Sequence, residues 1–237
     1  MSLIAKVFIL TTILSGLALV TWMAGAVDWV EPWLYVLAAL GALAQTIKVE
    51  GPNAQTNYNL AWFVYGFTFL TLGSAALLFV IVVAHLVEWA WHKYPWYIQA
   101  FNIGAHLLPA ALAGLVFDGV SAGVQGLDLS LALAMFLAGL VFVLGNHFMV
   151  GLVIRLARGQ SFAESGVFEF ICIFLDFCLL TMGMAAAMLW RTNPFVTLFS
   201  LLPLYILYNA IRLPALRRKV EELKRAAAVA PASAGAD

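Results

Sequence analysis

Charged residues are scarce in this sequence. Only 10% of the 237 residues are Asp, Glu, Lys or Arg, 64% are hydrophobic, and the formal net charge is zero. A typical soluble domain is about a quarter charged and about half apolar. A chain of this length and composition cannot bury its apolar surface in one soluble core, which excludes a soluble enzyme and a disordered protein. The balanced charge gives no reason to expect nucleic acid as a partner.

Cysteines and catalytic motifs are also few. Cys172 and Cys178, the two cysteines, lie six residues apart in one apolar run. That spacing does not place them on one ridge of a helix, so we expect neither a disulfide nor a metal site there. The sequence has no H-E-x-x-H, G-x-S-x-G or P-loop pattern. We therefore expect a protein that is not an enzyme, without catalytic residues or metal ligands, and the sequence identifies no cofactor.

Long apolar runs, by contrast, fill most of the chain. A bilayer core of about 30 Å is crossed by a helix of about 20 apolar residues. The runs are continuous rather than alternating, which indicates helices and not a β-barrel. We predict an all-α, polytopic transmembrane bundle of about seven helices over residues 1–213. The seven predicted spans are 3–25, 30–47, 60–91, 96–117, 129–156, 167–190 and 194–211.

Two of these spans, the third and the fifth, are too long for one straight crossing. Gly73 and Ser74 divide the third near its middle, and three glycines interrupt the fifth. Each span is therefore either a tilted helix or a broken one with a re-entrant segment. For the third span the sequence favours the broken, re-entrant form.

The basic residues orient the predicted bundle. Seven crossings place the two termini on opposite sides, with Lys6, Lys48 and Arg191 on the N-terminal side and the other nine basic residues across the membrane. Positive charge accumulates on the cytoplasmic side of membrane proteins. We therefore predict an N-terminus outside and a C-terminus inside the inner (cytoplasmic) membrane of a bacterium.

The C-terminal region has a different pattern. Residues 214–228 are basic, and Leu213, Leu216, Val220 and Leu223 recur every three to four residues, which predicts an amphipathic cytoplasmic helix. This helix either lies on the anionic membrane surface or forms a stalk that dimerises or contacts a signalling partner. Residues 229–237, rich in Ala, Pro, Ser and Gly, are predicted to be disordered.

Six polar residues inside the predicted spans are candidates for a ligand-binding site. Ionisable residues in a bilayer are costly and mark function, and these six all fall in the predicted cytoplasmic half. Three interpretations remain open: a ligand- or proton-sensing pocket, a metal or haem site, or hydrogen bonds that hold the helices together. Glu88, nearer the interface, suggests a salt bridge with Lys93. The six candidates are His85, Asn102, His106, Asn146, His147 and Asp176.

Several stretches resemble a known family. They are the polar loop 50–59 followed by WFVYGF at 62–67, VAHLVEW at 83–89, WYIQAFN at 96–102, and the exit LPLY at 202–205 to RLPAL at 212–216. Together they resemble the N-terminal multi-helix membrane sensor region of bacterial GGDEF and HD-GYP cyclic-di-GMP signalling proteins. The 237 residues contain neither output domain. The resemblance implies a sensor bundle that acts on a partner through residues 214–228.

We therefore expect an integral membrane protein of the sensor or signal-input type, with a small or lipophilic ligand in a polar pocket in the cytoplasmic half. Its expected partners are the lipid bilayer and a signalling protein or second copy at residues 214–228. One alternative is a small transporter or a substrate-binding transporter subunit, suggested by the broken helix and a loose likeness between residues 67–79 and 136–148. Another is an intramembrane redox or metal-dependent enzyme that uses the histidines.

Overall fold

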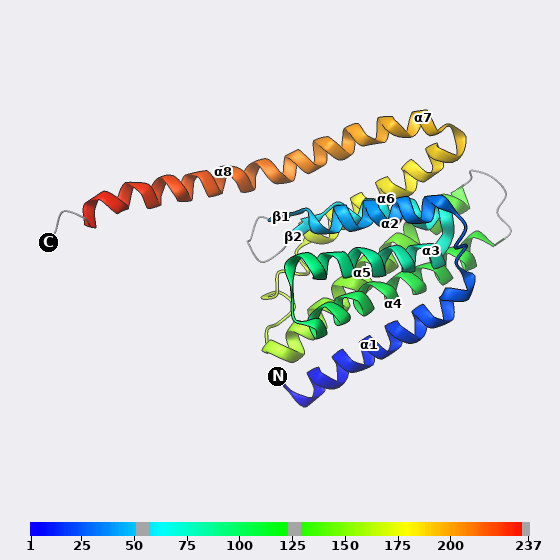
Figure 1. Cartoon of the computed structure of the whole chain (residues 1–237), viewed down its shortest axis with the longest axis horizontal. Coiled ribbons are helices and arrows are strands. Elements are labelled where there is room, and N and C mark those ends of the chain that lie inside the picture. The colour runs from blue at the N-terminus through cyan, green and yellow to red at the C-terminus, as the bar shows by residue number, and fades with distance from the viewer. Residues whose placement is uncertain (51–56, 123–128, 234–237) are drawn as a thin grey trace.

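The computed structural model describes residues 1–50, 57–122 and 129–233, and they form a bundle of long helices from which the last helix projects (Figure 1). The elements are α1 (Leu3–Met23), η1 (Ala24–Ala26), α2 (Pro32–Thr46), β1 (Lys48–Glu50), β2 (Asn57–Asn59), α3 (Ala61–His92), α4 (Trp96–Ser121), α5 (Leu129–Arg158), α6 (Phe170–Thr192), α7 (Pro194–Thr197), η2 (Leu198–Ser200) and α8 (Leu201–Ser233).

The all-α character is confirmed. Among the described residues, six helical segments are long and apolar enough to cross a bilayer. The expected second span is the exception: α2 has 15 residues, which is about 22 Å of helix and short of the hydrocarbon thickness. The predicted count of seven similar spans is therefore not reproduced.

The third helix is broken, as the glycine pattern predicted. Gly73 has φ +86° and ψ 176°, which only glycine adopts without strain. A Cβ placed on Gly41 of α2 would lie 3.7 Å from Val64 and 2.9 Å from Val80. In one straight helix those two valines would be about 24 Å apart. The two halves of α3, residues 61–72 and 74–92, are therefore antiparallel, whereas α5 is one continuous helix.

The reversal at Gly73 corrects the predicted topology. The N-terminus lies beside the end of α5, where Ser2 Oγ donates to the carbonyl of Leu156 at 2.9 Å, and α8 returns to the same side (Figure 1). The termini are thus on one side of the bundle and not on opposite sides, because the extra turn adds one change of chain direction. Eleven of the twelve Lys and Arg residues lie at this end or on α8 beyond it; we call it the basic end.

The exception among the basic residues is Arg191, at the opposite end of the bundle. Its guanidinium donates to the carbonyl of Leu70 in the first half of α3. Trp33 and Trp190 also meet there, with ring centroids 5.0 Å apart. Tryptophans at this level are typical of a membrane–water interface.

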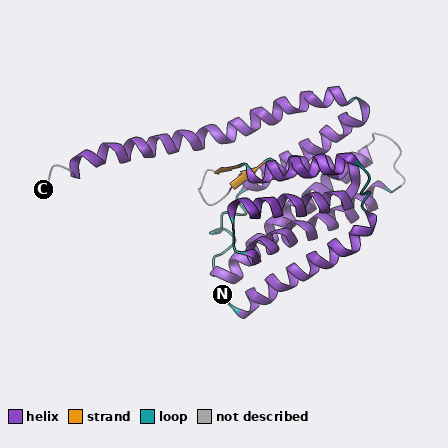
Figure 2. Ribbon diagram, in the orientation of Figure 1, coloured by secondary structure: helices purple, strands orange, loops and turns teal. Residues whose placement is uncertain are grey.

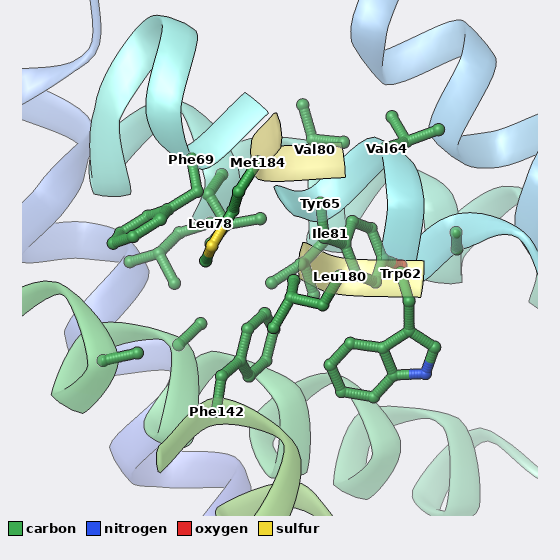
Figure 3. Packing of buried hydrophobic residues seen from close by; sticks show 14 of the residues in the cluster. Trp62, Val64, Tyr65, Phe69, Leu78, Val80, Ile81, Phe142, Leu180 and Met184 are labelled. Atoms are coloured by element: carbon green, nitrogen blue, oxygen red, sulfur yellow. The ribbon is translucent and has the colours of Figure 1, made fainter. Parts of the chain in front are cut away.

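The core lies between the two halves of α3, α6, α4 and α5. Large apolar side chains including Tyr65, Leu78 and Phe142 fill it (Figure 3). The closest approach joins the first half of α3 to α6, where a Cβ on Gly66 or Gly183 would lie 2.0 Å from a carbonyl oxygen of the other helix. Small residues let membrane helices pack this closely.

Strands are confined, among the described residues, to one short hairpin at the basic end (Figure 2). In it Lys48 pairs with Asn59 and Glu50 with Asn57, antiparallel. The Tyr58 hydroxyl lies 3.2 Å from Cys172 Sγ, which ties the hairpin to the start of α6. Both cysteines are free thiols.

The last helix is the least enclosed element. Leu204 and Leu207 of α8 pack against the bundle, and the helix then projects past the basic end (Figure 1). It runs through Pro214 without interruption to Ser233. The expected boundary at 213/214 is thus a point within one helix. Residues 229–233 of the expected tail belong to this helix, and residues 234–237 lie outside the described residues.

Candidate functional site

Buried polar side chains gather near the basic end in two adjoining groups. The first group, which we call the Glu88 cluster, has Glu88 at its centre. The second group is the pair His147 and Asp176. The members of the Glu88 cluster are Gln45, Lys48, His85, Glu88 and Gln99.

The Glu88 carboxylate is 2% exposed and saturated with donors. Its Oε2 accepts from Gln45 Nε2 at 3.0 Å, from Gln99 Nε2 at 3.1 Å and from His85 Nδ1 at 2.9 Å, while Oε1 pairs with Lys48 Nζ. A buried carboxylate is tolerated only when it is paired and hydrogen-bonded in this way. The interface salt bridge expected with Lys93 is replaced by this one.

Lys48 stands at the aqueous edge of the cluster. Burial of its ammonium disfavours the charge, but the Glu88 carboxylate and the Tyr94 hydroxyl outweigh that effect and raise the pKa of Lys48 above its usual value. Its Nζ donates to the Tyr94 hydroxyl at 3.3 Å. The hairpin that carries Lys48 therefore closes the basic end over the buried carboxylate.

Two histidine rings meet next to this cluster. With Nδ1–H of His85 donated to Glu88, its Nε2 is left buried and makes no hydrogen bond among the described residues. The ring of His106 lies 4.5 Å away, centroid to centroid. His106 donates its own Nδ1–H to the carbonyl of Asn102 at 2.9 Å. Each ring therefore keeps its Nε2 as the nitrogen open to a proton.

The pair His147 and Asp176 holds a proton by its geometry. His147 Nδ1 lies 2.7 Å from the carbonyl of Val167, and Nε2 lies 3.0 Å from Asp176 Oδ2. A carbonyl only accepts, so Nδ1 carries a hydrogen. The short contact at Nε2 then requires a second hydrogen, on Nε2 or on Asp176. The pair is thus either an imidazolium with a carboxylate or a neutral imidazole with a carboxylic acid.

The loop between α5 and α6 supplies that backbone acceptor. Ser161 and Glu164 bond reciprocally, with the Ser161 N–H donating to the Glu164 carboxylate at 2.7 Å and the Glu164 N–H donating to Ser161 Oγ at 3.2 Å. These bonds, the one from the Ser161 backbone first, lower the pKa of Glu164. The arrangement is a capping box that shapes the turn leading to Val167.

Trp62 and His106 join the two groups. Trp62 lies close to the Asp176 carboxylate, and its ring centroid lies 5.6 Å from that of His106. His106 in turn is within electrostatic range of His85, Glu88 and His147. The hairpin in α3 makes this possible, because Trp62 and His85 come from its two antiparallel halves.

The six residues expected to line one pocket have separate roles. His85 meets His106, and His147 meets Asp176, within the same network. Asn146 Nδ2 donates to the carbonyl of Ala105 at 3.1 Å, a bond from α5 to α4. Asn102 contributes its carbonyl to His106, and the residue lines a separate cavity of about 360 Å³ between α1, α4 and α5.

Several members of the network were not among those six residues. Gln45, Lys48, Gln99 and Trp62 gave little signal individually, because amides and aromatic residues at the edge of an apolar run are common. Gln45 and Gln99 lie near the ends of apolar helices and are nevertheless only 4% and 2% exposed. A buried amide in a membrane helix needs a partner, and that requirement was the available signal.

The described cavities lie outside the network. The first, about 350 Å³, opens at the opposite end between α2, the first half of α3, α6 and α8, with a mostly apolar lining. A third, of about 230 Å³, adjoins Gly73 and Arg191. Neither these two nor the cavity at Asn102 is lined by His85, His106, His147 or Asp176.

The geometry also bears on metal binding. No group of three or more His, Cys, Asp or Glu side chains in the described part of the chain is arranged to hold a metal ion. Two axial histidines of a haem lie on opposite faces of its plane. Ring centroids 4.5 Å apart, as in His85 and His106, leave no room for a porphyrin between them.

Comparison with known proteins is uninformative for this chain: no family model matches it, and neither a curated protein nor a solved structure is significantly similar to it. The fold and the site together define an α-helical bundle with membrane-spanning helices and a buried histidine–carboxylate network.

Proposed function

We propose that this protein is an integral membrane sensor of the signal-input type, and that the signal it binds is the proton. The binding network is the Glu88 cluster with His106, His147 and Asp176. We further propose that the basic end faces the cytoplasm of a bacterium, so that both termini are inside. The eleven basic residues at or beyond that end, against Arg191 at the other, support this orientation.

One observation carries the proposal: both ring nitrogens of His147 face acceptors. Loss of the shared proton would leave a lone pair on Nε2 directed at a carboxylate oxygen 3.0 Å away. That contact is repulsive, so deprotonation favours separation of α5 from α6. Besides the two members of the pair, the charged or polar groups that face it are His106 from α4 and Trp62 from α3.

The position of the network favours sensing over transport. Lys48, at the aqueous edge, connects the buried carboxylate to the basic end. Beyond the histidines, toward the opposite end, the core is apolar, with Leu77, Leu78 and Leu107 fully buried. A network that reaches water on one side only supports proton binding without passage across the membrane.

The output of the proposed sensor is α8. Helix α6 carries Asp176 and leads through the short α7 and η2 into α8. A shift of α6 relative to α5 is therefore passed along the chain to the helix that projects beyond the basic end. In this proposal, the proton site and the projecting helix act as one mechanical unit.

The test compares hydrogen exchange of the full chain in nanodiscs at acidic and alkaline pH, expressed as protection factors so that the intrinsic rise of amide exchange with pH is removed. We expect lower protection in the facing turns of α5 and α6 at alkaline pH, and loss of this difference in His147→Gln and Asp176→Asn. His92→Gln is the matched control, because His92 is exposed at the same end of the bundle and should leave the response intact. A wild-type protein whose α5 and α6 have the same protection factors at both pH values would refute the proposal. A response that persists in His147→Gln would refute it as well.

A further inference from the structure

The part of α8 that projects beyond the bundle carries an uncovered apolar stripe. Its members, which we call the stalk stripe, are Leu213, Leu216, Val220 and Leu223, and they are between 43% and 64% exposed. A contiguous apolar stripe on a projecting helix marks an interaction surface.

The stripe faces away from the protein's own bundle. Leu204 and Leu207 mark the side of α8 that packs against the core. Leu213 and Leu216 each follow one of these residues by nine positions, which is about half a turn around the helix axis at 100° per residue. The bundle therefore cannot cover the stripe, and its partner comes from outside.

The charges beside the stripe identify the kind of partner. The spacing of three, four and three residues is that of the a and d positions of a coiled coil. In that register the flanking g and e positions are Arg212, Arg217, Lys219 and Lys224, all basic. Glu221 and Glu222, the acidic residues of this segment, fall at b and c, away from the seam. The stripe is thus bordered on both sides by positive charge alone.

A second copy of the chain does not fit this border. In a parallel pair each g residue faces an e residue of the other helix, which brings Arg212 to Arg217 and Lys219 to Lys224. An antiparallel pair sets e against e and g against g, and the charges are again alike. Like charges at these positions oppose pairing and are a common device against the wrong partner.

The membrane surface is a less suitable partner for the stalk stripe than another helix is. α8 is continuous through Pro214 and projects past the basic end in line with its membrane-spanning part (Figure 1). A helix on this course leaves the headgroup layer instead of lying in it. The basic residues beside the stripe therefore lie beyond the headgroups, and the acidic surface that pairs with them belongs to a partner outside the membrane.

We propose that the stalk stripe pairs with an amphipathic helix of another protein whose own flanking positions are acidic. Such a helix supplies apolar a and d residues to the stripe and Glu or Asp opposite the four basic positions. This pairing does not depend on proton binding at His147, so each proposal can fail without the other.

The test uses the full chain in nanodiscs of zwitterionic lipid and two designed peptides of about four heptads. Both peptides have Leu and Ile at a and d; one has Glu at every e and g position and the other has Lys. Fluorescence anisotropy measures their binding. We expect the Glu peptide to bind at least about tenfold more tightly than the Lys peptide, because four attractive pairs replace four repulsive ones.

Charge reversal sharpens the test. The double variant Arg217→Glu with Lys219→Glu should bind the Glu peptide about tenfold more weakly and the Lys peptide more tightly than the wild type does. The matched control is Arg218→Glu with Arg225→Glu, which changes net charge equally at the outer f positions and should change binding by less than about threefold.

Three results would overturn the proposal. Equal affinity for the two peptides would show that the basic residues beside the stripe do not favour an acidic partner. A dimer of the chain in sedimentation experiments, abolished by Leu216→Asp, would assign the stripe to a second copy. Failure of the Glu peptide to bind, together with insertion of a label at Val220→Cys into nanodiscs containing anionic phosphatidylglycerol, would assign it to the membrane.

Discussion

The crossing of the first half of α3 with α6 offers the most direct test of the packing. Gly66 and Gly183 face each other's helices with no space for a side chain. A Cβ on Gly66 would lie 2.0 Å from the carbonyl oxygen of Leu180, and one on Gly183 would lie 2.0 Å from that of Phe63. A carbon and a carbonyl oxygen in contact are about 3.3 Å apart. The helices must therefore separate by about 1.3 Å to admit one methyl group.

We expect Gly66→Ala to destabilise the bundle by about 3 kcal/mol. Overpacking of a close contact costs about 1–3 kcal/mol, and separation of the helices also forfeits dispersion contacts along the crossing. The carbonyl cannot rotate aside because it belongs to a helix. Gly183→Ala should cost a similar amount, and the double variant less than the sum, since one separation relieves both clashes.

The assay is unfolding in mixed micelles titrated with a denaturing detergent. Gly119→Ala serves as the control: it also lies within a helix, α4, but a Cβ there meets no atom within 4 Å. It should gain up to about 1 kcal/mol from helix propensity. A Gly66→Ala protein as stable as Gly119→Ala would refute the crossing, as would full additivity of Gly66→Ala and Gly183→Ala.

Three further predictions concern the basic end and the break in α3. Because Glu88 and Tyr94 raise the pKa of Lys48, the pair stabilises the fold fully below the ordinary lysine pKa of about 10.4 and loses that effect as pH rises through the higher native value. Alkaline pH should therefore destabilise the wild type more than Lys48→Met, and equal slopes of stability against pH would contradict this. Glu88→Leu should cost about 3–5 kcal/mol in the same unfolding assay, since it leaves the buried donors of Gln45 and His85 without this acceptor and the Lys48 ammonium without its carboxylate; a cost below about 1 kcal/mol would argue against the cluster. Gly73→Ala should destabilise by about 1–3 kcal/mol, because φ +86° with ψ 176° is a conformation that is essentially restricted to glycine, although a Cβ there meets no atom within 4 Å; an unchanged stability would mean that the turn is not formed.

Some of this molecule was predictable from local pattern alone. Low charge and continuous apolar runs indicate membrane-spanning helices, because an apolar, uncharged helix is stable in a bilayer whatever the arrangement of its neighbours. The break at Gly73 was predictable for a similar reason: a glycine near the middle of an overlong run is a local signal. The depths of His85, His106, His147 and Asp176 also follow from counting residues along each helix.

The partners of those residues depended on the fold. Whether Gly73 merely kinks α3 or turns it back on itself is decided by packing against α2 and α6, and that choice sets the direction of every later helix. It moved the N-terminus to the basic end and brought Lys48, not Lys93, to Glu88. The side chain of Asn146 was expected to contact a ligand. Its amide instead donates a hydrogen bond to the carbonyl of Ala105 in the neighbouring helix.

Hydropathy thus determines that a residue is inside the membrane, and periodicity determines which face of its helix it occupies. Neither states which helix lies opposite, because apolar helix surfaces are chemically alike and many arrangements bury them equally well. Only close packing, such as Gly66 against Gly183, distinguishes one arrangement from another. The contacts of His147 with Asp176 and with the carbonyl of Val167 exist because that packing brings three separate segments to one point.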